Sequence, residues 1–169
     1  MDNQRFFYLV EGECEEKLLN ALKMNPPLIH PGKVEKFNII QNEIPRRKLM
    51  QYPAGCVVVF VFDRDKEVTA DLQANLKSLS SLPFKVEIMT VPQVLTFEDE
   101  IKRSTDVNRA QDLTKSKTVN DFKSAVNKVK EKDFRSTLIR HKLDMGILWS
   151  QKPPKAFSFI RQGGDKIKM

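Results

Sequence analysis

The chain reads Val57-Val58-Val59-Phe60-Val61-Phe62 and continues directly into Asp63-Arg64-Asp65. An unbroken run of β-branched and aromatic residues is typical of a strand inside a parallel sheet, which helices cover on both faces. In proteins of this class, ligands bind in the crevice outside the carboxyl ends of the strands. The stretch therefore predicts an α/β fold and places two carboxylates where a ligand would bind.

A second apolar stretch, Phe6-Phe7-Tyr8-Leu9-Val10, also ends in acidic residues, in the segment Glu11-Gly12-Glu13-Cys14-Glu15-Glu16. Because the carboxyl ends of parallel strands lie at one edge of a sheet, we expect the two acidic clusters to meet there. Gly12 permits a tight turn from strand to helix. Acids in the first turn of a helix also interact favourably with its dipole, which is an alternative explanation for Glu13, Glu15 and Glu16.

Strands and helices alternate through the first hundred residues. Leu18, Leu19 and Leu22 form the apolar stripe of a helix that Asn25-Pro26-Pro27 ends. The alternation predicts one parallel sheet with right-handed crossover connections and flanking helices. The predicted strands span residues 5–10, 34–40, 56–62 and 86–91, and the predicted helices span 15–24 and 68–80, with a short helix or loop at 46–51.

The chain becomes mostly helical and basic after Pro92. Thr96 is a suitable helix cap, with Asp99 or Glu100 near the first turn. Further helices are predicted at 119–132 and 134–143. The chain is thus predicted to comprise an α/β metal-binding core (1–103), a basic helical extension packed on it (104–150) and an extended C-terminal appendage (151–169).

The net charge of +7 is unevenly distributed along the chain. Residues 1–100 contain 12 Lys and Arg against 15 Asp and Glu, whereas residues 101–169 contain 17 against 7. DNA or RNA would be attracted by the second part and repelled by the carboxylates of the first unless a cation lay between them. This layout fits a metal-dependent nucleic-acid enzyme, although a Lys-rich helical surface can also be a solvated face. The predicted phosphate-binding lysines are Lys115, Lys117, Lys123, Lys128 and Lys130.

Carboxylate oxygens are the ligands that Mg²⁺ or Mn²⁺ prefers. Asp63 and Asp65 are two residues apart, so in an extended loop they point the same way and could bind one ion. A solvated pair of loop acids has the same spacing. Glu98 belongs to a third acidic cluster, at the end of the fourth predicted strand, where helix capping is the alternative explanation. The predicted metal ligands are Glu11, Glu15, Asp63, Asp65 and Glu98, with Glu11, Asp63 and Asp65 as the catalytic set.

The order Val10-Glu11-Gly12, then a distant apolar strand with Asp63-Arg64-Asp65, resembles the Toprim domain of topoisomerases, primases, OLD-family nucleases and small ribonucleases. The resemblance implies a Toprim-like sheet and metal binding by the first Glu and both Asp residues. It is closest to the OLD and RloB-like branch, whose Glu-Gly-x-x-Glu motif falls on Glu11, Gly12 and Glu15. Pro92 and Phe97-Glu98 match a further feature of RloB-like proteins, so the resemblance covers about residues 5–103.

The chain departs from that branch in two ways. OLD-type nucleases place a lysine after the last metal-site strand, and here Lys102, Lys166 and Lys168 are candidates. OLD nucleases also carry an ATPase domain, whereas this chain contains no Walker A motif. The resemblance therefore implies a metal-dependent endonuclease that works with a separate ATPase partner in phage defence.

Two other function classes remain open at this stage. The same fold could serve a non-catalytic regulatory or toxin-like subunit that binds nucleic acid or a partner, or a receiver-like or phosphatase domain that uses one Asp after a strand. Cys14 and Cys56 lack the spacing of a zinc site, and no apolar run approaches the roughly 20 residues needed to span a bilayer. We expect a cytoplasmic protein, with homo-oligomerisation possible.

Overall fold

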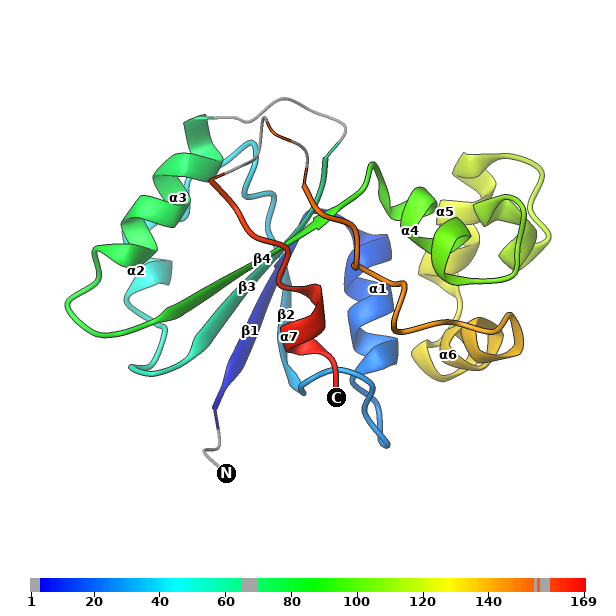
Figure 1. Cartoon of the computed structure of the whole chain (residues 1–169), viewed down its shortest axis with the longest axis horizontal. Coiled ribbons are helices and arrows are strands. Elements are labelled where there is room, and N and C mark those ends of the chain that lie inside the picture. Colours follow the sequence, from blue (N-terminus) through cyan, green and yellow to red (C-terminus); the bar gives the residue numbers. More distant parts are fainter. Residues whose placement is uncertain (1–3, 65–69, 154, 156–158) are drawn as a thin grey trace.

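A computed structural model describes residues 4–64, 70–153, 155 and 159–169. Its centre is a four-stranded sheet in the order β2-β1-β3-β4, in which every neighbouring pair is parallel (Figure 1). The predicted α/β fold with a parallel sheet is therefore confirmed. The strands are β1 (Phe6–Val10), β2 (Gly32–Lys36), β3 (Val57–Asp63) and β4 (Glu87–Gln93).

Helices cover both faces of the sheet (Figure 1). One apolar cluster joins alternate residues of β1 and β3 to α1, α4, α5 and α6, and a second joins the opposite faces of these strands to α2 and α3. The helices are α1 (Glu13–Leu22), α2 (Arg46–Leu49), α3 (Ala70–Ser80), α4 (Phe97–Ser104), α5 (Val119–Lys128), α6 (Glu131–Arg140) and α7 (Gly164–Ile167), with a 3₁₀ helix η1 (Ala110–Thr114).

The burial of β3 on both faces of the sheet explains why its sequence is uniformly apolar. Val57, Val59 and Val61 lie in the cluster with α1, and the intervening Val58, Phe60 and Phe62 lie in the cluster with α3. All of these side chains are fully buried. Since successive side chains of a strand point to opposite faces, a strand covered on both faces requires apolar residues at every position.

The connections diverge between β1 and β3. The chain leaves β1 through α1 toward β2, and leaves β3 toward α3 and β4. Because α1 and α3 pack on opposite faces, the carboxyl ends of the two strands form the topological switch point, where open α/β sheets bind ligands. Glu11 and Asp63 lie at this point.

Several predicted element boundaries were wrong. The second strand ends at Lys36 instead of residue 40, because the Asn38 side chain accepts hydrogen bonds from the backbone N–H groups of Ile40 and Gln41, both at 3.1 Å. Such local side-chain bonds compete with a strand ladder. Asp63 is the last residue of β3, opposite Gln93, and does not lie in the following loop.

The predicted helix over 119–132 is in fact two elements. Val129 and Lys130 adopt extended backbone conformations between α5 and α6, and the Lys17 ammonium donates to the Val129 carbonyl at 2.8 Å. The next helix begins at Glu131, not at 134, and ends at Arg140. Acids in its first turn favour this start.

The segment predicted as an extended C-terminal appendage packs against the sheet in its described part. The Gly163 N–H donates to the Thr90 carbonyl at 2.7 Å, and the Thr90 hydroxyl donates to the Arg161 carbonyl at 2.5 Å. Ile167 is fully buried, and its carbonyl accepts from the His30 N–H. The segment thus covers part of the outer edge of β4, which protects a sheet edge from pairing with other chains.

Within the described residues, no helix has the length and apolar character needed to cross a membrane.

Gly164 should be required for this packing. A Cβ atom at Gly164 would lie 2.6 Å from the Trp149 Cβ and would overlap the Trp149 carbonyl oxygen. We therefore expect Gly164→Ala to lower the free energy of unfolding by about 1–3 kcal/mol. Gly146→Ala, where the added atom meets only the Asp144 side chain at 3.1 Å, is the control, with an expected change within about 0.5 kcal/mol. Urea unfolding measures both, and equal stability of the two variants would contradict the assignment.

Candidate functional site

Glu11 and Asp63 meet at the carboxyl edge of the sheet, as their places after neighbouring strands predict. The Asp63 backbone N–H donates to Glu11 Oε2 at 3.2 Å, and the Asn38 amide donates to Glu11 Oε1 at 3.3 Å. Asn38 follows β2, so residues from the ends of three adjacent strands converge on the Glu11 carboxylate. The site therefore belongs to the sheet edge and does not depend on one loop.

Glu15 enters the same site from helix α1. Gly12 precedes the helix, and a Cβ atom there would lie 2.9 Å from Glu15 Oε2, so a glycine lets this carboxylate approach the backbone closely. Glu15 is only 6% exposed. Burial raises its pKa most strongly, and hydrogen bonds from its own backbone and from Gln93 oppose this, while the negative charges of Glu11 and Glu98 raise it further.

Gln93 links two of the predicted acids and was missed by the sequence analysis. Its side chain is fully buried at the end of β4, and its amide nitrogen donates to Glu15 Oε1 at 3.1 Å and to Asp63 Oδ1 at 2.7 Å. Its amide oxygen accepts from the Trp149 indole N–H at 3.5 Å. The sequence offered only a polar residue just after a predicted strand, because the register that places Gln93 opposite Asp63 is a property of the fold.

Glu100 connects the backbone next to Gln93 with the backbone of Trp149. It is fully buried, accepts from the backbone N–H groups of Val94 and Trp149, both at 3.0 Å, and forms an ion pair with Arg103. Trp149 has a left-handed backbone conformation (φ 54°) and is fully buried. The Trp149 side chain is therefore part of the core, and Glu100 is the acid of the cluster Glu98-Asp99-Glu100 that reaches the interior.

Glu98 forms an ion pair with a lysine from the basic part of the chain. The Lys123 ammonium, on α5, lies 2.9 Å from Glu98 Oε1. Burial lowers the pKa of Lys123, but the hydrogen bond and charge of Glu98 outweigh this and raise it overall, with smaller contributions from Cys14 and Asp63. Lys123 lines a pocket of about 190 Å³, together with residues that include Gly12, Cys14, Glu15, Phe97 and Asn127. Of the five predicted phosphate-binding lysines, Lys123 thus contacts the acidic edge.

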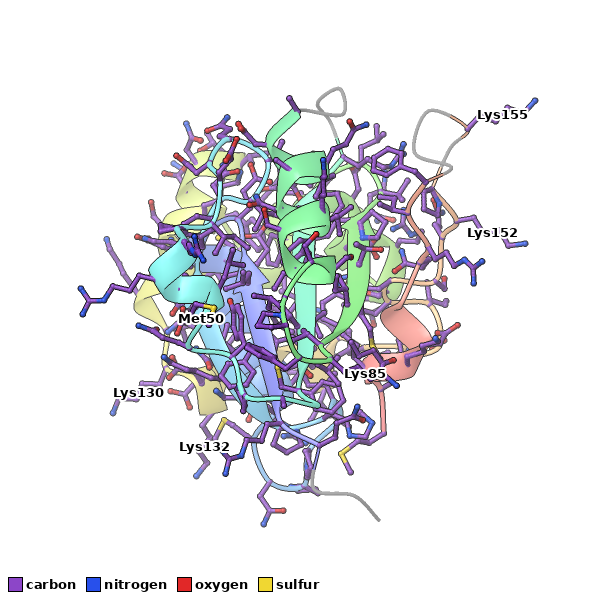
Figure 2. All side chains as sticks on the ribbon, turned by 90° about the vertical axis from the view of Figure 1, so that its left-hand side faces the viewer. Met50, Lys85, Lys130, Lys132, Lys152 and Lys155 are labelled. Carbon is purple, nitrogen blue, oxygen red and sulfur yellow. The ribbon has the colours of Figure 1, made fainter. Side chains whose placement is uncertain are left out.

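The other predicted lysines are exposed. Lys115 and Lys117 lie between η1 and α5, and Lys128 and Lys130 lie at the junction of α5 and α6. Figure 2 shows Lys130 extending outward on the opposite side of the view from Lys152 and Lys155. Among the candidates for a catalytic lysine, Lys102 is exposed on α4, Lys166 is on α7 and Lys168 pairs with Asp165. Asp65 lies outside the described residues.

Oxygen donors at this edge suit a hard cation such as Mg²⁺. The Asp63 backbone N–H contacts the Glu11 carboxylate. Burial raises the pKa of Glu15 most strongly, and the charges of Glu11 and Glu98 add to the rise; a cation would relieve this charge repulsion. In the part of the chain that the structure describes, no three Asp, Glu, His or Cys side chains are grouped closely enough to hold a metal ion. The five-residue ligand set, which includes Asp65, therefore stays a prediction.

Fold and site together define an α/β protein with a parallel sheet and an acidic cluster at its topological switch point. Comparison with family models, with curated proteins and with solved structures gave no match for this chain.

Gln93→Leu should destabilise the protein, because Gln93 connects Glu15, Asp63 and Trp149 through hydrogen bonds. The substitution removes the amide that Glu15 and Asp63 share and leaves the Trp149 indole N–H without its acceptor. We expect a loss of about 1–3 kcal/mol in the free energy of unfolding, the usual cost of a buried polar group that loses its partner. Urea unfolding followed by the fluorescence of Trp149, the single tryptophan, measures it.

The matched control is Gln73→Leu, on the exposed side of α3. If both substitutions changed stability equally, the bonds of Gln93 would not hold the site together.

Proposed function

We propose that this protein is a metal-dependent nuclease of the Toprim class, which hydrolyses phosphodiester bonds in DNA or RNA. The observation that carries the proposal is the contact between Glu11 and Asp63 at the switch point of a parallel sheet, with Glu15 joined to Asp63 through Gln93. These are residues at which the sequence resembles the Toprim motifs.

In this proposal Glu11, Asp63 and Asp65 hold Mg²⁺ or Mn²⁺, with Glu15 and Glu98 as further ligands. A bound divalent ion would supply activation of the attacking water and neutralisation of charge on the scissile phosphate. Gln93 orients the Glu15 and Asp63 carboxylates, since its amide donates one hydrogen bond to each. Positioning by such fixed bonds is how a protein tunes a metal site from outside the ligand set.

The basic part of the chain supplies the contacts to the nucleic-acid backbone. Lys123 already lies at the acidic edge, and the exposed Lys115 and Lys117 precede its helix. Contacts to phosphate carry no base information, so sequence preference should be low and binding should weaken with salt. A separate ATPase partner and a role in phage defence belong to the same proposal, and they rest on the resemblance to RloB-like proteins.

Isosteric variants test the proposal. We expect wild-type protein with Mg²⁺ or Mn²⁺ to cut plasmid, linear DNA or structured RNA, and Glu11→Gln and Asp63→Asn each to cut at least about a hundredfold more slowly, since metal assistance is worth several kcal/mol. The readout is a gel time course with each substrate. Glu43→Gln, an exposed acid elsewhere, should cut at the wild-type rate. Undiminished cutting by both site variants would exclude the acidic edge as the centre of hydrolysis.

A second candidate function is a non-catalytic subunit that binds nucleic acid or a partner. Two observations favour it: Glu98 is paired with Lys123, and Gln93 donates to Glu15 and Asp63, so groups of the protein already engage these acids. In that case wild-type protein would not cut any substrate, but it would bind nucleic acid in a salt-sensitive way. Asp63→Asn would then leave binding unchanged.

A further inference from the structure

A hollow of the described structure lies away from the acidic edge, between α3, β4 and the C-terminal segment. Its volume is about 530 Å³, within the range of roughly 300–1,000 Å³ that small-molecule sites occupy. Figure 2 faces this side of the molecule, with α3 at the centre and the C-terminal segment beyond β4. We propose that this hollow binds a small molecule in which a flat apolar ring carries an anionic group.

Apolar side chains from three separate elements form its walls. Leu76 comes from α3, Ile88 and Met89 come from β4, and Phe159 and Ile160 come from the C-terminal segment. Ile160 is buried, whereas Phe159 is 45% exposed, so the aromatic ring lies where a ligand would cover it. Walls of this kind favour a flat apolar group, because burial of apolar area is the main driving force for such binding.

The charged groups in the lining have one sign. Arg161 and Lys166 contribute to the lining, and no described carboxylate does. Asp165, the acid next to Lys166 in the sequence, is ion-paired with Lys168 at 2.8 Å. Neither Arg161 nor Lys166 forms an ion pair with any described acid. Two cations beside an apolar hollow therefore select an anion.

The site is formed in advance by hydrogen bonds between the C-terminal segment and β4. Gly163 donates to the Thr90 carbonyl, Thr90 donates to the Arg161 carbonyl, and the Gln162 amide donates to the Pro92 carbonyl at 3.0 Å. A Cβ atom on Gly163 would lie 3.0 Å from the Thr90 carbonyl oxygen, so glycine lets the two segments lie this close. Preorganisation lowers the entropic cost of binding.

This site is independent of the proposed nuclease centre. Ile160 packs in the apolar cluster with α3, whereas Glu15 lies in the first turn of α1, on the opposite face of the sheet. None of the residues that line the hollow is among the predicted metal ligands. Binding here can therefore be tested whether or not the protein cuts nucleic acid.

A pair of probes with the same rings tests the proposal. 8-Anilinonaphthalene-1-sulfonate carries a sulfonate, and N-phenyl-1-naphthylamine is its uncharged counterpart. We expect the sulfonate to bind with one molecule per chain in calorimetry, and to bind several-fold more tightly than the uncharged probe. Equal affinity of the two probes, or sulfonate binding at several sites of similar strength, would overturn the proposal.

Variants locate the binding. Replacing both cations, by Arg161→Ala with Lys166→Ala, should weaken sulfonate binding about tenfold, because each partly exposed charge pair contributes modestly. Ser80→Phe, at an exposed lining position on α3, should fill the hollow and weaken both probes. The control is Lys85→Ala with Lys152→Ala, two exposed lysines on the same side of the molecule that are outside the lining (Figure 2). Equal loss in the control, or unchanged binding in both lining variants, would place the probe elsewhere and refute the assignment.

Discussion

The complete burial of β3 is the constraint on which the rest of the structure depends. A strand with Val or Phe at six consecutive positions has no face that can meet water, so the chain must place helices on both sides and strands on both edges. The backbone of β3 pairs with β1 on one edge and with β4 on the other, and α1 and α3 cover its two faces. Since α1 follows one neighbour of β3 and α3 follows β3 itself, the topological switch point between β1 and β3 is a consequence of this covering. The closeness of Glu11 and Asp63, at the ends of these two strands, follows from it.

The sequence could predict those parts of the molecule that depend on periodicity and strand order. The apolar runs identified β1 and β3, and parallel order then brought Glu11 and Asp63 to one edge. The capping box of Thr96 and Asp99 was also predictable, since it depends on local spacing. By contrast, the break at Val129 and Lys130 is set by Lys17 from a helix more than a hundred residues earlier. No local pattern carries that information.

Gln93 shows why part of the site could not be found from sequence alone. A glutamine has no distinctive spacing, and its role depends on register, since β3 and β4 place it opposite Asp63. Its partner Trp149 is distant in the sequence. The backbone N–H of Trp149 donates to Glu100, and the Trp149 carbonyl lies against Gly164. The buried polar atoms of β4 are thus satisfied by the C-terminal part of the chain, as buried polar groups must be. The C-terminal residues therefore complete the environment of the acidic site as well as covering an edge.

The acidic and basic parts of the chain are in contact in the folded structure. Helices α5 and α6 pack on α1 through apolar residues such as Phe122 and Phe134, and polar bonds reinforce this packing, including the ion pair of Lys17 with Glu131. Because α1 begins with the acids that follow β1, any helix packed along it must pass beside them. The basic extension thereby brings Lys123 to the acidic edge. There burial lowers the pKa of Lys123, but the hydrogen bond and charge of Glu98 raise it overall. A charge distribution that looks like two separate halves in the sequence is, in the fold, one acidic centre with a cation from the basic half beside it.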